Sequence, residues 1–173
     1  MRTFAEYKAV RSFYGDRTAK RTKLPYINHI DEALLILEWR GASELTMRAY
    51  CLHPLFQGDA DLSLSWQRDL SEFDPHALVL AMEYRSIANG YLSRDVISAV
   101  SEIRLSPLAE VNEMLVADKI QNRKDFELHF HGPNERISEL QNYFSNWLQR
   151  LDVDESTYQE TRNRLIAATS AKQ

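Results

Sequence analysis

Apolar residues recur at three- and four-residue spacing along most of the chain, which is the period of a helix that buries one face. The first example runs from Phe4 to Tyr14, and Gly15 follows it as a suitable stop. No stretch alternates convincingly between apolar and polar residues, as a half-buried strand does. The pattern predicts helices over 3–14, 26–39, 43–56, 75–93, 94–103, 107–128, 134–151 and 154–169, with a short one around 65–70.

These segments predict an all-α bundle of roughly seven to nine helices. No internal repeat or low-complexity linker divides residues 1–173, so we expect one domain, with the last helix at about 154–170 packing on it. Pro54 lies inside the predicted helix over 43–56 and has no backbone N–H to donate. We therefore expect that helix to kink or break near His53.

Composition and charge narrow the range of functions. The chain is 44% apolar and 27% charged, which is ordinary for a folded globular protein and argues against disorder. Its net charge of −4 predicts no general attraction to nucleic acid or to an anionic membrane. Cys51 is the only cysteine, which excludes an internal disulfide and a thiolate metal cluster. The first seven residues lack the apolar core of a secretory signal, so we expect a cytoplasmic protein.

Three residues on separate predicted helices carry side chains that bind metal ions: His29, His53 and Asp118. Two imidazoles and one carboxylate suit Mn²⁺, Fe²⁺ or Zn²⁺, and they leave coordination positions open for water and phosphate. The corresponding chemistry is hydrolysis of a phosphate ester by metal-bound water. Asn122 follows Asp118 by one helical turn, where it can orient that water or the substrate. A core or capping role is the alternative for each histidine taken alone.

Basic side chains flank these candidate ligands and suggest contacts to phosphate. Arg21 and Lys23 lie in a polar segment over 16–24, and Arg85 lies on the predicted helix over 75–93. The alternative for all three is an ordinary solvated surface, because most charge runs are solvated.

Four short motifs give the chain a resemblance to a known family. They are PYINH at 25–29, AYCLH at 49–53, MLVADKIQN at 114–122 and YFSNW at 143–147. In order and approximate spacing they resemble motifs of the RelA/SpoT-type HD hydrolase domain and its small single-domain relatives, the metazoan SpoT homologues. The resemblance covers about residues 5 to 150, but the segment from about 61 to 105 has no counterpart.

Membership in that family would imply an HD-domain-like helical bundle with a Mn²⁺ site. It would also imply hydrolysis of the 3′-pyrophosphate of guanosine tetra- or pentaphosphate, (p)ppGpp. The resemblance implies that three residues match the family's metal ligands: His29, His53 and Asp118. Asn122 and Tyr143 match positions near the bound nucleotide, and Arg21 matches a residue that packs on the base.

The chain departs from the family pattern where that pattern carries its acids. Pro54 stands where the aspartate of the HD pair is expected, and Gln57 and Gly58 stand where the family has a Glu-Asp pair that activates water. Loss of a general base commonly costs a factor of about 10² to 10⁴ in rate. Asp59 and Asp61 follow closely, and either can complete the metal shell or act as the base if the chain bends back after Pro54.

Two functions remain open at this point. The first is a divergent HD-domain phosphohydrolase that binds a nucleotide or another phosphorylated small molecule, with Mn²⁺ as the expected ion. The second is a catalytically inactive HD fold, a pseudoenzyme that binds and regulates another protein. The presence or absence of a bound metal ion separates the two.

Overall fold

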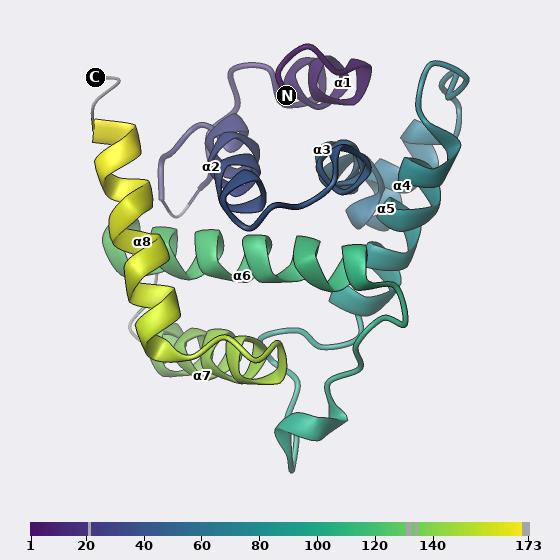
Figure 1. The fold of residues 1–173 in the computed structure, drawn as a ribbon. Helices are drawn as coiled ribbons and strands as arrows, with labels where there is room; N and C mark the ends of the chain where they lie inside the picture. The colour runs from purple at the N-terminus through teal and green to yellow at the C-terminus, as the bar shows by residue number, and fades with distance from the viewer. Residues whose placement is uncertain (21, 131–132, 134, 171–173) are drawn as a thin grey trace.

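The computed structural model describes residues 1–20, 22–130, 133 and 135–170, and most of these residues are in helices (Figure 1). They form eight α-helices and one short 3-10 helix, with no strand in these ranges, which confirms the predicted all-α class. The elements are α1 (Ala5–Tyr14), α2 (Tyr26–Trp39), α3 (Glu44–Gln57), α4 (Asp59–Ser65), α5 (Pro75–Ala88), η1 (Val100–Glu102), α6 (Ala109–His129), α7 (Glu135–Arg150) and α8 (Glu155–Ser170).

Helix α6 runs through the middle of the molecule. In Figure 1, α2 and α3 lie above it, α7 lies below it and α8 crosses one end, and each of these helices packs on α6. Because α6 is covered on several sides, every residue from 114 to 121 is buried. A helix covered in this way is expected to be apolar all round. The polar residues within that buried stretch, Asp118, Lys119 and Gln121, therefore need polar partners in the interior.

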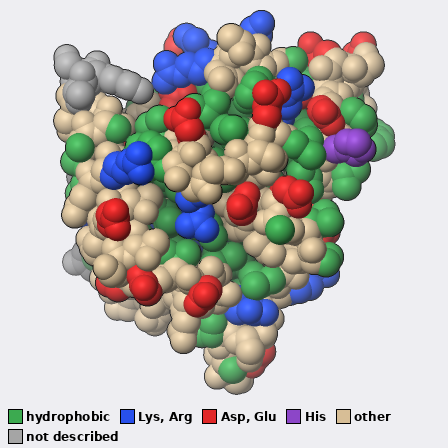
Figure 2. Space-filling view, in the orientation of Figure 1, with side chains coloured by type: hydrophobic (Ala, Val, Ile, Leu, Met, Phe, Trp, Pro, Cys, Tyr) green, Lys and Arg blue, Asp and Glu red, His purple; other side chains and the backbone are tan. Residues whose placement is uncertain are grey.

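The last helix packs against α6 and α2. Its side chains Tyr158 and Leu165 are completely buried. None of the helices that the structure describes combines the length and the apolar character needed to cross a bilayer. Figure 2 shows acidic and basic side chains interspersed on the face in view.

The segment between α5 and α6 differs from the prediction. The expected helix over 94–103 is a loop that contains only the single turn η1, and α5 ends at Ala88 although we predicted a helix to 93. Serine and the β-branched residues of this segment are weak helix formers. The Asp95 side chain also accepts the backbone N–H of Leu92 and closes a turn instead. Val96 is 97% exposed and Ile97 and Val100 are only partly buried, so most of the segment makes too little apolar contact with the core to anchor a helix.

The chain after Pro54 also differs from the prediction. Helix α3 continues past His53 to Gln57, and the break comes at Gly58, whose backbone is extended. A new helix, α4, begins at once, with Asp59 and Asp61 in its first turn, where acidic side chains interact favourably with the helix dipole. The short helix expected around 65–70 therefore lies over 59–65 instead.

Candidate metal and ligand-binding site

Three helices bring a metal-binding set of side chains together in the interior. His29 lies in the first turn of α2, His53 near the end of α3 and Asp118 in the buried middle of α6. One ligand atom from each lies within 4.8 Å of the other two. The His29 Nε2 atom is 3.4 Å from His53 Nε2 and 3.3 Å from Asp118 Oδ1. The three residues could therefore hold one metal ion between them.

His53 is oriented by a carbonyl of its own helix. Its Nδ1 atom lies 2.6 Å from the backbone oxygen of Tyr50. A carbonyl oxygen only accepts, so Nδ1 carries the hydrogen and donates it. Burial, together with repulsion from His29, lowers the pKa of His53 to about 3, so the ring is neutral near pH 7. Its Nε2 atom then offers a lone pair to the group.

His29 is oriented by the side chain of Gln121 in α6. The Gln121 Nε2 group donates to Glu32 Oε2 at 2.9 Å and to Asp125 Oδ2 at 2.8 Å, and carboxylates only accept. This arrangement fixes the amide so that its Oε1 atom faces His29 Nδ1, 2.6 Å away. His29 Nδ1 must therefore carry a hydrogen. The Lys124 ammonium binds both carboxylates and neutralises part of their charge.

Asp118 lies between cationic and polar groups. The Lys119 Nζ atom is 2.8 Å from Asp118 Oδ2, and Asn122 Nδ2 donates to Oδ1 at 3.0 Å. Burial by itself would raise the pKa of Asp118, but attraction to Lys119 and the hydrogen bond with His29 hold it well below its ordinary value. Burial likewise opposes protonation of His29, and its bonds to Asp118 and Gln121 nevertheless raise its pKa above 6.5. Asp118 is therefore an anion that attracts a proton or a cation at His29.

The chemistry of the donor set fits a transition-metal ion. Both histidines carry hydrogen on Nδ1, so a neutral His29 and His53 each present Nε2 as a ligand atom, and Asp118 adds an anionic oxygen. Two nitrogens and one oxygen make three protein ligands, which leaves positions for water or substrate. The Tyr50 hydroxyl, 2.9 Å from His29 Nε2, donates to that nitrogen when the ring is neutral. An incoming ion would replace this hydrogen bond.

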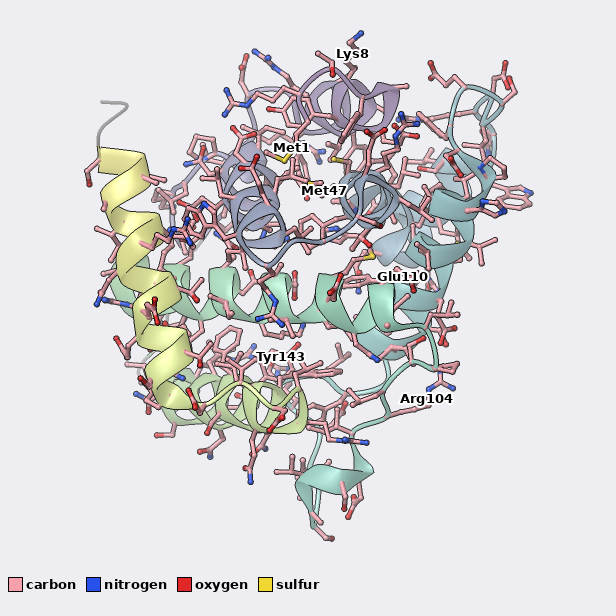
Figure 3. All side chains as sticks on the ribbon, viewed as in Figure 1. Met1, Lys8, Met47, Arg104, Glu110 and Tyr143 are labelled. Carbon is pink, nitrogen blue, oxygen red and sulfur yellow. The ribbon has the colours of Figure 1, made fainter. Side chains whose placement is uncertain are left out.

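An open cavity of about 500 Å³ lies beside His53 and Asp118. Three residues predicted to act near a ligand, Asp61, Asn122 and Tyr143, lie in its wall. Tyr143, labelled in Figure 3 between α7 and α6, accepts a hydrogen bond from Lys119 Nζ at 3.1 Å. The remaining wall is Phe13, Tyr14, Arg17, Tyr26, Pro54, Gln57, Gly58, Tyr84, Ala88, Leu92 and Lys119.

Three of the other predicted site residues lie away from this cavity. The Asp59 side chain is 96% exposed and forms an ion pair with Arg85, so each neutralises the other and neither lines the wall. Lys23 is exposed in the loop before α2 and also does not line it. Asp59, in the first turn of α4, therefore points to solvent and is not brought together with the His29–His53–Asp118 group. Arg21 lies outside the described residues.

The positions that depart from the family pattern have local roles here. Gln57 Nε2 donates to Asn89 Oδ1 at 2.5 Å, and Asn89 Nδ2 donates to the Gln57 carbonyl at 3.2 Å. This pairing ties α3 to α5. A Cβ atom placed on Gly58 would lie only 2.8 Å from Asp61 Oδ2. The Asp61 carboxylate thus occupies the space that a side chain at position 58 would need.

Two cations in the cavity wall were not among the predicted ligand contacts. Arg17 donates to the carbonyl oxygens of Phe13 and Tyr14 at the end of α1, and its guanidinium lies 4.8 Å from the centre of the Phe13 ring. Lys119 reaches the cavity from α6. Arg17 belongs to the same basic segment as Lys23, and Lys119 follows Asp118 directly, so both were visible in the sequence. Which member of a charge run turns inward depends on the packing.

A second cavity of about 340 Å³ shares two wall residues with the first, Tyr14 and Tyr26, whose stacked rings have centres 5.2 Å apart. His29, Gln121 and Asn122 form part of its wall. The rest is mainly apolar, with phenylalanines from α6 and α7. The His29–His53–Asp118 group therefore borders two adjoining cavities.

No protein-family model, no curated protein and no solved structure matches the chain. The fold and the site are therefore described by their helices and side chains alone. They describe an all-α protein in which two histidines and one aspartate meet at the junction of two cavities, with a lysine bound to the aspartate.

Proposed function

We propose that the protein binds a divalent transition-metal ion at His29, His53 and Asp118, and a nucleotide or another phosphorylated small molecule in the adjacent cavity. Mn²⁺ is the expected ion, and the protein would be a divergent HD-domain phosphohydrolase. The observation that carries the proposal is the convergence of two histidine Nε2 atoms and one aspartate oxygen within 4.8 Å. Nitrogen ligands with one carboxylate suit borderline ions of this kind.

Cationic and polar groups in the wall would hold the phosphate. Lys119 has three N–H donors, of which Asp118 and Tyr143 use two, so the third can bind a phosphate oxygen. Arg17 supplies a second positive charge in the same wall. Asn122, which donates to Asp118, can also contact the ligand. A bound metal ion would polarise the phosphate and lower the pKa of a water molecule.

Asp61 is the residue best placed to act as a base. Among the described residues, Asp61 and Asp118 are the only carboxylates in the cavity wall, and Asp118 is committed to Lys119 and the metal group. Asp61 also occupies the space beside Gly58, next to the position where the family has a water-activating acid. We propose that it takes the proton from the attacking water.

The second function, an inactive HD fold that binds another protein, has an observation of its own. The Gln57 amide neither gains nor loses charge near neutral pH, so it cannot act as a base, and it is held by Asn89. The Lys119 ammonium already balances the Asp118 charge, so the group is stable without an ion. A protein without metal or turnover would fit this description.

Metal analysis separates the two functions. The wild-type protein, purified without chelator and then dialysed against Mn²⁺ or Zn²⁺, should retain about one equivalent. His53→Ala should lose it, and His76→Ala should not, because His76 is exposed and outside the group. Retention below about a tenth of an equivalent by the wild-type protein would refute the proposal, since sites of this kind hold such ions tightly.

Ligand binding is tested on the metal-loaded protein by calorimetry with guanosine tetraphosphate, other nucleotides and inorganic phosphate. We expect a phosphorylated ligand to bind and Tyr143→Phe to weaken it, because the Tyr143 hydroxyl fixes Lys119 in the cavity wall. Product formation above the level of His53→Ala would establish hydrolysis. A metal-loaded protein that binds none of these ligands would contradict the ligand half of the proposal.

A further inference from the structure

Pro54 occupies an unfavourable position in α3. It lies in the last turn of a helix that continues to Gln57, and it is buried. A proline there has no N–H to donate to the carbonyl of Tyr50, four residues earlier, and its ring crowds that carbonyl. Such a residue usually weakens a helix. Its presence in a continuous helix therefore calls for a compensating contact.

The compensating contact is made by the neighbouring histidine. The Tyr50 carbonyl, left without its helical partner, accepts a hydrogen from His53 Nδ1 at 2.6 Å. In an ordinary helix the N–H of residue 54 would occupy this oxygen. The hydrogen bond from His53 thus takes the place of the backbone hydrogen bond that Pro54 cannot make.

We propose that Pro54 is a positioning residue for His53: it leaves the Tyr50 carbonyl free to hold Nδ1–H, so that Nε2 faces His29 and Asp118. The inference deepens the proposed metal-binding function and rests on it for the consequence for metal affinity. The tautomer of His53 in the metal-free protein can be tested independently of that function.

Ring packing cannot supply the same selection. The His53 ring lies against Tyr50 and Tyr84, with ring centres 4.4 and 4.8 Å away, and these contacts restrict its plane. A neutral imidazole can carry its hydrogen on either nitrogen in one and the same plane. The acceptor at Tyr50 is the contact that selects Nδ1, and it leaves Nε2 unprotonated 3.4 Å from His29 Nε2.

Restoring an N–H at position 54 should therefore have opposite effects on the helix and on the site. In Pro54→Ala the new N–H donates to the Tyr50 carbonyl and competes with His53. The helix gains a hydrogen bond, and we expect the midpoint of thermal unfolding to rise by about 4–10 °C. His53 loses its exclusive acceptor, and we expect metal affinity to fall about tenfold, as is usual when a partner of a metal-binding histidine is lost.

The experiment compares wild type, Pro54→Ala and Pro54→Val, two variants that restore the N–H with side chains of different size. Three quantities are measured: the unfolding midpoint, the dissociation constant of Zn²⁺ or Co²⁺, and the His53 tautomer. Nitrogen-15 NMR of the metal-free protein at pH 8 reports the tautomer. We expect both variants to show a higher midpoint, weaker metal binding and a larger fraction of the Nε2–H form.

A merely structural proline would change the midpoint alone. An unchanged tautomer and an unchanged dissociation constant in both variants would overturn the inference. If the wild-type protein binds no metal, the proposed function fails. The tautomer comparison then still decides whether Pro54 positions His53.

Discussion

Replacing Gln121 by leucine removes the side chain that orients His29 while keeping a residue of similar size. Gln121 is completely buried and makes three hydrogen bonds: it accepts one from His29 and donates one each to Glu32 and Asp125. The two carboxylates keep their contacts with Lys124, at 2.6 and 2.8 Å. His29 Nδ1–H is therefore the group left without a partner.

The expected cost follows from these contacts. A buried donor without a partner costs about 1–3 kcal/mol, and weakening two hydrogen bonds to charged acceptors adds to this. Burial of the leucine side chain offsets part of the loss. We expect the free energy of unfolding to fall by about 3 kcal/mol, or about 6–12 °C in the unfolding midpoint. Metal affinity should also fall by about 10- to 100-fold, because His29 Nε2 is no longer presented in one tautomer.

Urea unfolding and titration with Zn²⁺ measure the two effects. The matched control is Gln141→Leu, the same substitution at an exposed position of α7, which should change the free energy of unfolding by less than about 0.5 kcal/mol. A loss below about 1 kcal/mol in Gln121→Leu would show that the buried network does not hold His29. Normal metal affinity in a destabilised Gln121→Leu would show that the network has only a structural role.

Three further predictions concern pH, the base and the competing cation. As the pH falls from 6.5 to 5, the free energy of unfolding should fall by up to about 2 kcal/mol. Over this range His53 takes up a proton in the unfolded chain but not in the folded protein, where its pKa is lowered to about 3. Above pH 6.5 the raised pKa of His29 acts in the opposite sense, and stability is lost as the pH rises through that pKa. The free energy of unfolding, measured with urea from pH 5 to 8, should therefore show a maximum. A steady rise over this range would contradict the prediction. If the protein hydrolyses a nucleotide, Asp61→Asn should slow it by about 10²- to 10⁴-fold in steady-state assays, and equal loss in Asp59→Asn would contradict the assignment. Lys119→Met should tighten Zn²⁺ binding about tenfold in a competition titration, since the ammonium no longer neutralises Asp118, and weaker binding would refute this.

The helices were predictable because their signal is local. The spacing of apolar residues identified α1, α2, α3 and α5 to α8, with boundaries off by a few residues. The prediction failed over 94–103, where apolar residues are present but Val96 has no surface to pack against. The spacing of apolar residues shows which of them would share one face of a helix. Whether the helix forms depends on another part of the fold against which that face can pack.

The candidate site, too, was predictable only in part. Side-chain chemistry and order along the chain indicated His29, His53 and Asp118, and the structure brings them together. The roles of Gln121 and of the Tyr50 carbonyl could not be predicted, because nothing in the sequence distinguishes them from other polar side chains and backbone carbonyls.

The sequence by itself determined the all-α class and the three side chains able to bind one ion, since both depend on residue type and spacing. The tertiary structure decided which neighbours complete the site. It turns Asp61 toward the cavity and Asp59 to solvent, because residues two positions apart in a helix lie on different faces. It also places the Tyr50 carbonyl and the Gln121 amide against the two histidines. Such choices depend on distances between α2, α3 and α6, which only packing of the whole chain sets.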